Sequence, residues 1–311
     1  MPTAMLIGGR GFIGSAMVPL LVARGFRVVC VEPTATTLGR LTPWADQVEL
    51  VNASVADPEA LQQVVEAHSP DCMANLVFAH GPTIAQELDV MARGVWNTLD
   101  AASSGGCDRV ALASSVRVYG PQRIHGAETM VNEESVCRPS IRYGVVKLMA
   151  EYLAEDYRRK HGLVATALRI PMVYGPGVKR GAEGVNVPAV AAATGEAHVL
   201  PCDPNARLCL AHVGDVAACL VDFIDPDLTP PSHAVYELGG TTLSYNEMVE
   251  CASLVVGGAI PVSFEPDGRG REHDYAYLLD NTRLRTEYGF EHRSVTEGYR
   301  EVIDGLRGGH D

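Results

Sequence analysis

Residues 3–25 read TAMLIGGRGFIGSAMVPLLVARG and open the chain with a strand, a glycine-rich turn and a helix. The apolar run at 3–9 predicts a buried strand. The segment 13–24 reads as a helix, and it is followed directly by Gly25, a residue that commonly ends helices. We therefore expect a first strand that leads through a tight turn into the first helix.

Three glycines lie in this turn with the spacing G-x-x-G-x-x-G: Gly8, Gly11 and Gly14. The first permits a tight turn, the second lets the backbone approach a pyrophosphate, and the third lets the helix pack on the strand. The start of the helix then offers free N–H groups and a positive partial charge to phosphates. A purely structural glycine turn is the alternative, but the position between strand and helix favours a dinucleotide site.

Strand and helix alternate from there to residue 170. Further strands are expected at 27–32, 47–54, 72–79, 109–115 and 163–170, and helices at 58–69, 90–106 and 142–153. This order predicts an α/β fold, a Rossmann-type doubly wound parallel sheet with helices on both faces. Proline and glycine become frequent after Pro171, which indicates a smaller, mixed C-terminal lobe.

This change in composition after Pro171 predicts two domains. Residues 1–170 are expected to form the dinucleotide-binding Rossmann domain. Residues 171–311 are expected to form mainly a substrate-binding lobe, with part of 205–240 returning to the Rossmann domain. A length of 311 residues suits two domains.

Composition excludes several classes of protein. Hydrophobic residues make up 47% of the chain and charged residues 20%, so a sizeable core can form. A formal net charge of −13 argues against a nucleic-acid surface, and no stretch approaches the ~20 apolar residues of a membrane span. The eight cysteines form no C-x-x-C pair, so a metal site is not expected. A cytoplasmic, reducing compartment fits best, with a small-molecule substrate as the partner.

Glu32 ends the second expected strand, 24 residues after Gly8. A carboxylate there can accept hydrogen bonds from the adenosine ribose, and it repels a 2′-phosphate. NAD is therefore the expected cofactor. Arg10, inside the glycine turn, keeps NADP open as the alternative, because a cation there could meet a 2′-phosphate.

Tyr143 and Lys147 lie four residues apart in the helix expected at 142–153, so they share one helical face. Such a pair is often ordinary packing. However, Ser115 closes the fifth expected strand, at the edge where open α/β sheets bind ligands, and the fold could bring the three side chains together. Ser114 beside it reads as a serine of an ordinary turn.

These pieces together resemble the extended short-chain dehydrogenase/reductase superfamily, and within it the NAD-dependent epimerase/dehydratase family, whose best-known member is UDP-galactose 4-epimerase. The segments that carry the resemblance are GGRGFIG at 8–14, SSVRVYG at 114–120, YGVVK at 143–147, LRIPMVYGPG at 168–177 and HVGDVAAC at 212–219. They run in the family's order across most of the chain, so we expect an NAD-dependent enzyme.

The resemblance implies roles for individual residues. Tyr143 is the expected acid/base, Lys147 lowers the pKa of Tyr143 and binds the nicotinamide ribose, and Ser115 holds the substrate oxygen. The expected contacts to NAD are Gly8, Gly11, Phe12, Ile13, Gly14, Glu32, Ser54, Val55, Leu76, Val77, Tyr143, Lys147 and Pro171. The expected contacts to substrate are Met172 and Arg207.

Departures from the family pattern reduce the number of reactions and substrates that we expect. Val116 and Arg117 stand where the sugar-nucleotide dehydratases carry an Asp-Glu pair, which argues against 4,6-dehydration. Met172 stands where an asparagine often binds substrate, which indicates a smaller or less polar substrate. The leading hypothesis is an epimerase or oxidoreductase that acts on a secondary alcohol or ketone. The alternatives are a net NAD(P)-dependent dehydrogenase or reductase of a small non-nucleotide substrate and a non-catalytic NAD(H)-sensing module.

Three further expectations concern assembly and loops. The family pairs the helix near 90–104 with the catalytic helix in a homodimer, which Val146, Met149 and Leu153 would suit as well as they suit an internal core. Asp215 is expected to be a helix N-cap. Four basic residues could approach an anionic ligand: Lys179, Arg180, Arg269 and Arg271.

Overall fold

The computed structural model describes residues 1–34, 37–78, 83–177, 183–266 and 275–308. The chain folds into two compact units. Unit 1 comprises Met1–Val118, Ile141–Arg169 and Ala217–Tyr236, and unit 2 comprises Tyr119–Ser140, Ile170–Val216 and Glu237–Asp311. Each unit is therefore assembled from separate stretches of the sequence.

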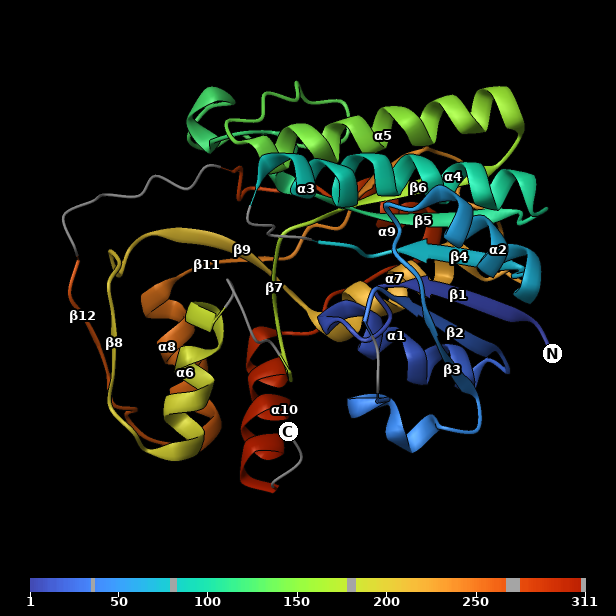
Figure 1. The fold of residues 1–311 in the computed structure, drawn as a ribbon. Coiled ribbons are helices and arrows are strands. Elements are labelled where there is room, and N and C mark those ends of the chain that lie inside the picture. The colour runs from blue at the N-terminus through green and yellow to red at the C-terminus, as the bar shows by residue number, and fades with distance from the viewer. Residues whose placement is uncertain (35–36, 79–82, 178–182, 267–274, 309–311) are drawn as a thin grey trace. The chain divides into compact units, whose positions relative to one another are not determined.

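Unit 1 is built on the large sheet (Figure 1). Its seven strands are β1 Thr3–Ile7, β2 Arg27–Glu32, β3 Val48–Asn52, β4 Cys72–Asn75, β5 Arg109–Ser115, β6 Val164–Ile170 and β10 Val235–Glu237, in the order β10-β6-β5-β4-β1-β2-β3. Neighbouring strands from β3 to β5 run parallel, with Leu6 of β1 opposite Cys30 on one side and Ala74 on the other. The predicted fold class, a Rossmann-type doubly wound sheet, is confirmed.

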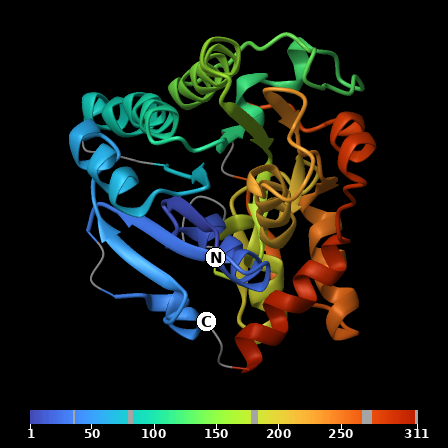
Figure 2. The same ribbon diagram turned by 90° about the vertical axis from the view of Figure 1, so that its right-hand side faces the viewer.

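Helices cover both faces of this sheet (Figure 2). One face carries α1 Phe12–Ala23 and α7 Val213–Ile224, and Arg24 links them through ion pairs to Asp222 and Asp225. The other carries α2 Pro58–His68, α4 Gly94–Ser104 and α5 Arg142–His161. Met5 and Ile7 alternate with Ala4 and Leu6 along β1, and all four are buried because both faces are covered.

The helices α4 and α5 carry four exposed large side chains that we call the apolar stripe: Trp96, Val145, Met149 and Tyr152. Their exposed fractions are 53%, 53%, 38% and 70%. Of the three residues considered for a dimer contact, Met149 belongs to this stripe. Val146 is 4% exposed and Leu153 packs against the buried core, so these two face inward.

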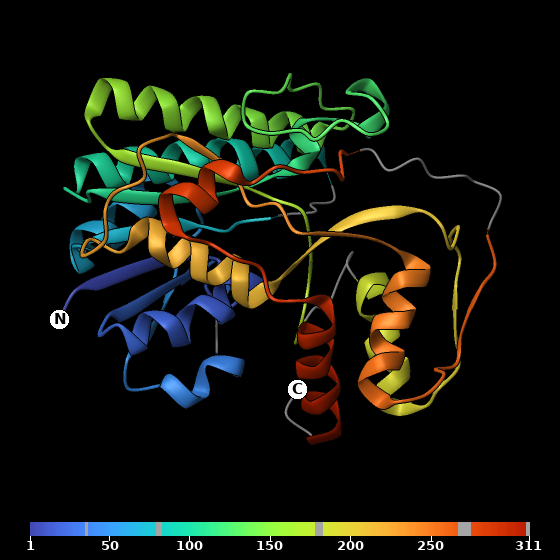
Figure 3. The ribbon, with the colours of Figure 1, turned by 180° about the vertical axis from the view of Figure 1, so that it is seen from behind.

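Unit 2 combines small sheets with helices (Figure 3). A three-stranded sheet has the order β11-β9-β7, with β7 Met172–Tyr174, β9 Arg207–His212 and β11 Thr241–Ser244, and β8 His198–Leu200 pairs with β12 Val262–Phe264. The helices α6 Glu183–Thr194, α8 Tyr245–Val256 and α10 Val295–Gly308 pack against one another, and α9 Thr282–Tyr288 precedes α10. No helix among the described residues combines the length and apolar character needed to cross a bilayer.

Two local expectations were wrong. The strand expected at 72–79 ends at Asn75, because the Asn75 side chain accepts a hydrogen bond from the Val77 N–H and turns the chain out of the sheet. Asp215 lies inside the first turn of α7 and bonds Arg293; the imidazole of His212 accepts the Gly214 N–H at that helix start instead.

Candidate active site

The predicted site residues of unit 1 follow the C-terminal ends of its strands. Gly8 follows β1, Glu32 ends β2, Leu76 follows β4 and Ser115 ends β5. Because these strands are parallel, their ends meet at one edge of the sheet. The strand order reverses at β1, which lies between β2 and β4, and such a reversal is where open α/β sheets bind their ligands.

The glycine turn leaves its backbone open to a ligand. Gly8 has a φ of +87°, which favours glycine, and its carbonyl accepts the Gly11 N–H at 3.0 Å. A Cβ on Gly14 would lie 2.6 Å from the Gly8 oxygen, so a larger residue would displace the turn. Phe12 and Ile13 begin α1, and in this described segment no side chain caps the helix start. The turn therefore fits a pyrophosphate at a helix N-terminus.

Leu76 and Val77 adjoin this turn from β4. A Cβ on Gly8 would lie 3.6 Å from the backbone carbon of Leu76. Asn75 holds the segment: its Oδ1 accepts the Val77 N–H at 3.1 Å, and its Nδ2 donates to Thr98 Oγ1 of α4 at 2.8 Å. Asn75 did not stand out in the sequence, although an amide at the end of the apolar run CMAN is a signal for such a role.

Glu32 is bound to the glycine turn. Its Oε1 accepts the Arg10 N–H at 2.6 Å. Burial raises the pKa of the Glu32 carboxyl, while this hydrogen bond and the charge of Arg10 oppose the rise. Glu32, which is expected at the adenosine ribose, and Arg10, which kept NADP open, are thus hydrogen-bonded neighbours.

Ser54 and Val55 follow β3 and face different surroundings. Ser54 Oγ accepts the Ala56 N–H at 3.2 Å within its own turn. Val55 is buried against Gly94 of α4, and its carbonyl accepts the Asn97 side chain at 2.9 Å. The Val55 side chain therefore packs in the core, which leaves its backbone as the part that could meet a cofactor.

Tyr143 lies in the first turn of α5, and Ser115 ends β5. The Ser115 hydroxyl is close enough to the Tyr143 phenol to lower its pKa. The ring of Phe78 meets the Tyr143 ring edge to face, with centroids 5.3 Å apart. Burial raises the pKa of Tyr143, whereas the Ser115 hydroxyl and the charge of Arg117 lower it.

Lys147 lies one helical turn further along α5 and is buried. Its Nζ donates to the carbonyl of Ala113 at 2.7 Å and to that of Val77 at 3.5 Å. The Nζ lies 5.5 Å from the centroid of the Tyr143 ring. Burial lowers the pKa of Lys147 to about 8. The ammonium is thus held at the ends of β4 and β5, beside the phenol.

A buried polar cluster lies behind these residues, and we call its three members, Ser114, Glu151 and Arg169, the buried triad. Ser114 Oγ donates to Glu151 Oε1 at 2.5 Å. Arg169 of β6 donates to both carboxylate oxygens of Glu151, at 2.9 and 2.7 Å. Glu151 is four residues beyond Lys147, so β5, β6 and α5 are joined directly behind the candidate site.

The remaining predicted residues lie in unit 2 or outside the described chain. Pro171 is buried, and Met172 is half-buried at the start of β7. Arg207 is exposed at the start of β9, with its guanidinium 5.8 Å from the centroid of the Tyr277 ring. Four basic residues lie outside the described residues: Lys179, Arg180, Arg269 and Arg271.

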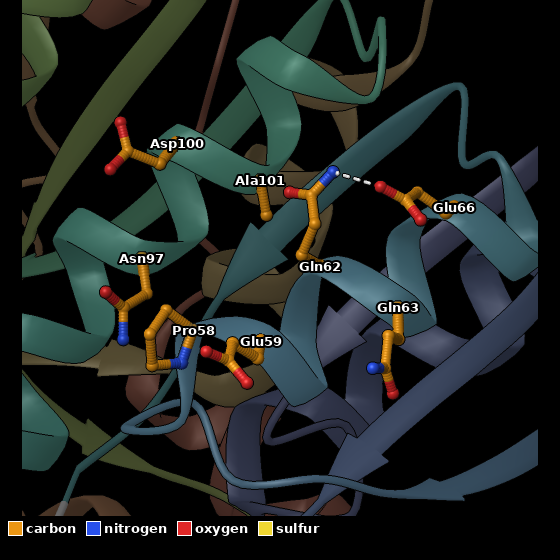
Figure 4. Close-up of a pocket in the computed structure, with 8 residues that line it drawn as sticks. All are labelled: Pro58, Glu59, Gln62, Gln63, Glu66, Asn97, Asp100 and Ala101. Atoms are coloured by element: carbon orange, nitrogen blue, oxygen red, sulfur yellow. Dashed lines mark hydrogen bonds between the residues drawn. The ribbon is translucent and has the colours of Figure 1, made fainter.

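A surface pocket of about 490 Å³ lies between α2 and α4 in unit 1 (Figure 4). Its lining is acidic, with Glu59, Glu66 and Asp100, and Gln62 donates to Glu66 across one turn of α2 at 3.0 Å. It contains none of the predicted site residues. Among the described residues, no group of three or more His, Cys, Asp or Glu side chains is arranged to hold a metal ion, there or elsewhere.

Residues 4–239 match the model of the NAD dependent epimerase/dehydratase family, so the chain belongs to that family. The predicted family and class of enzyme are confirmed, and the family's name carries the predicted cofactor, NAD.

Characterised relatives of this chain catalyse different net reactions. The chain is 28% identical to the dTDP-glucose 4,6-dehydratase of Streptomyces niveus over 97% of its length and 92% of the relative's. It is 26% identical to the D-erythronate dehydrogenase of Cupriavidus necator over 85% and 86% of the two lengths. The crystal structure of Thermus thermophilus UDP-glucose 4-epimerase in complex with NAD superposes with a TM-score of 0.81, at 23% identity over 98% and 99% of the chains.

Proposed function

We propose that this protein transfers a hydride between NAD and a secondary alcohol or ketone, with Tyr143 as the acid/base. The observation that supports it best is the convergence of Ser115, Tyr143 and Lys147 at the C-terminal edge of the sheet, where Ser115 affects the pKa of the Tyr143 phenol and the Lys147 Nζ lies 5.5 Å from the Tyr143 ring centroid. A protein that only sensed NAD(H) would need none of these three side chains.

The residues around this edge fit NAD. The turn of Gly8, Gly11 and Gly14 suits the pyrophosphate, because it leads into the start of α1 without a side-chain cap and a Cβ on Gly14 would displace it. Glu32 suits the adenosine ribose and disfavours a 2′-phosphate. Lys147, whose Nζ has two carbonyl partners and three protons to donate, suits the nicotinamide ribose. When bound, NAD supplies the hydride acceptor for the carbinol carbon.

The side chains of this protein then handle the proton. Ser115 holds the substrate oxygen, and Tyr143, as phenolate, takes the hydroxyl proton while the carbinol carbon gives up its hydride. For reduction the same phenol returns a proton to the carbonyl oxygen. Burial raises the pKa of Tyr143, while Ser115 and the charge of Arg117 lower it. The Lys147 ammonium, 5.5 Å from the ring centroid, would add to the two effects that favour the phenolate.

Two net reactions remain in the proposal. Epimerisation would use Tyr143 twice, first to accept the proton and then to return it after the keto intermediate has turned. Net oxidation would use it once, and the similarity to D-erythronate dehydrogenase over 85% of this chain supports a small hydroxy compound as substrate. Dehydration lacks support, because Val116 and Arg117 follow Ser115 and neither can serve as a second acid/base at neutral pH.

The experiment is a substrate panel with purified protein and NAD, which includes sugar nucleotides and small hydroxy acids. Net formation of NADH identifies a dehydrogenase, and a change of isomer without net NADH identifies an epimerase. Tyr143→Phe should then lower turnover by roughly 10²- to 10⁴-fold while NAD affinity stays close to that of the wild type.

The control is Tyr152→Phe, which removes a phenol hydroxyl from the exposed side of the same helix and should leave turnover unchanged. Turnover retained in Tyr143→Phe would contradict the assignment of the acid/base.

We also propose a homodimer formed through the apolar stripe of Trp96, Val145, Met149 and Tyr152. The stripe lies on the two helices that the family resemblance predicts at the dimer contact, and an exposed Trp and Tyr are typical of protein interfaces. Val145→Glu should shift the protein from dimer to monomer in sedimentation, whereas Leu254→Glu, at an exposed leucine of α8, should not. A wild-type monomer would contradict the proposal.

A further inference from the structure

Phe78 is an exposed aromatic residue that contacts the candidate acid/base. It is 55% exposed, whereas Phe26 and Phe223, which pack in the interior, are each 2% exposed. The Phe78 ring meets the Tyr143 ring edge to face, with centroids 5.3 Å apart and an angle of 79° between the ring planes. Two aromatic rings favour this arrangement. One part of the Phe78 ring therefore packs on Tyr143, and another part faces solvent.

The backbone that leads to Phe78 is held in place at the sheet edge. Leu76 adjoins the glycine turn, two residues before Phe78. The Val77 N–H donates to Asn75 Oδ1 at 3.1 Å, and the Val77 carbonyl accepts the Lys147 ammonium at 3.5 Å. The segment thus runs from the proposed pyrophosphate site to the candidate acid/base, and Phe78 lies at its reacting end.

The exposed part of the Phe78 ring is next to the place proposed for the substrate. A carbinol whose oxygen is bound by the Tyr143 phenol has carbon substituents, and Phe78 is the aromatic side chain in contact with the Tyr143 ring. An alkyl substituent that covers the Phe78 ring removes apolar surface of both groups from water, which is favourable. A hydroxyl in the same place would lose its water without gaining a hydrogen bond, because the side chain of phenylalanine offers no polar partner.

We propose that Phe78 is a specificity-determining residue whose exposed face receives an alkyl group attached to the reacting carbinol carbon. The substrates are accordingly small secondary alcohols with a hydrocarbon arm, in preference to alcohols that carry a hydroxyl on that arm. The inference rests on the proposed function, because Tyr143 places the substrate oxygen. It deepens that proposal by naming the chemical class of the group beside the reacting carbon.

The test compares two alcohols that differ by one hydroxyl on this arm, 3-hydroxybutanoate and 3,4-dihydroxybutanoate. Their dissociation constants are measured by calorimetry on the purified protein with NADH, because NADH cannot accept a hydride and the bound alcohol stays intact. The wild type should bind 3-hydroxybutanoate about tenfold more tightly, the lower end of the discrimination that one small group gives in an apolar contact. Phe78→Ala should nearly abolish this preference, and Phe78→Leu, which keeps an apolar side chain, should retain most of it.

The control is Leu254→Ala, which removes an exposed apolar side chain from α8 and should leave the preference unchanged. Turnover gives a second readout. For an alcohol with an alkyl arm, Phe78→Ala should raise KM while kcat stays close to that of the wild type, the pattern expected when a binding contact is lost.

Three results would overturn the inference: a wild type that does not bind 3-hydroxybutanoate more tightly, a preference that survives in Phe78→Ala, and an equal loss of affinity for both alcohols in that variant. The last result would assign the ring to the support of Tyr143 or of the cofactor. Hydride transfer through Tyr143 without the preference would leave the proposed function standing. Selective binding without hydride transfer would support the inference and contradict the proposed function.

Discussion

Two buried cations, Lys147 of α5 and Arg169 of β6, have opposite surroundings. Arg169 is 3% exposed, and it binds both oxygens of the Glu151 carboxylate, which also accepts the Ser114 hydroxyl. Lys147 is 5% exposed, one turn before Glu151 on the same helix, and its hydrogen bonds go to the carbonyls of Ala113 and Val77. Arg169 thus has a carboxylate as its partner at 2.7 Å, whereas Lys147 has uncharged carbonyl groups as its partners.

The charge of Arg169 is neutralised by a carboxylate, whereas the charge of Lys147 lowers the free energy of unfolding. A buried ammonium without a carboxylate is destabilising, and burial accordingly lowers the pKa of Lys147 to about 8. Such a group is typical of a functional site, where stability is sacrificed for chemistry. The buried triad, in contrast, joins β5, β6 and α5 and carries no reactive group toward the sheet edge. The comparison predicts that the two cations respond oppositely to removal.

Arg169→Met should give the larger effect. The variant leaves the Glu151 carboxylate buried without its partner, so the free energy of unfolding should fall by about 3–5 kcal/mol. Denaturant unfolding measured at neutral pH tests this.

The matched control for Arg169→Met is the double variant Glu151→Leu with Arg169→Met, which removes both charges. It should unfold within about 1 kcal/mol of the wild type or be more stable, because no charge is left unpaired. A single variant as stable as the wild type would mean that Arg169 and Lys147 do not differ in the way proposed.

Lys147→Met should give a smaller change of opposite sign in stability. The methionine keeps the apolar stem and removes the buried charge, so the free energy of unfolding should rise by about 3 kcal/mol at neutral pH, the equivalent of a pKa lowered from 10.5 to about 8. NAD binding and turnover should both weaken, since Lys147 is the proposed ribose ligand.

The stability gain expected for Lys147→Met should depend on pH, because the pKa of Lys147 is lowered in the folded protein. The folded pKa of Lys147 lies below the unfolded value, so between about pH 8 and 10.5 the unfolded chain holds the proton that the folded chain has lost. This group therefore makes the wild type more stable as pH rises through that interval. The advantage of Lys147→Met over the wild type should shrink across the same interval in unfolding measured at several pH values. An advantage that is absent or grows with pH would contradict the assignment.

The order of strands and helices could be predicted from the sequence because each depends on residues close together in the chain. The apolar run before Gly8 makes β1, and the glycine spacing makes the turn into α1. Local patterns failed where a side-chain hydrogen bond changed the outcome. Asn75 bonds the Val77 N–H two residues later and Thr98 of α4 where β4 ends, and Asp215 bonds Arg293, 78 residues later, instead of capping α7.

In the candidate site, too, some residues could be predicted from the sequence and others could not. Ser115, Tyr143 and Lys147 could be found by spacing and family resemblance, because their types and order are characteristic. Ser114 was expected in an ordinary turn, yet it donates to Glu151, and neither Glu151 nor Arg169 stood out in the sequence. A glutamate four residues beyond Lys147 and an arginine inside the apolar strand β6 are the signals that could have indicated a buried pair.

The amino-acid sequence by itself determined the class of fold, the edge of the sheet proposed to bind the ligand, and the three side chains proposed for catalysis, since periodicity, glycine spacing and motif order are properties of the linear chain. Only the tertiary structure decided which charges are paired. Whether a cation meets a carboxylate, as Arg169 does, or carbonyls alone, as Lys147 does, depends on strands and helices distant in sequence that meet within a few ångströms, where electrostatic interactions are strongest.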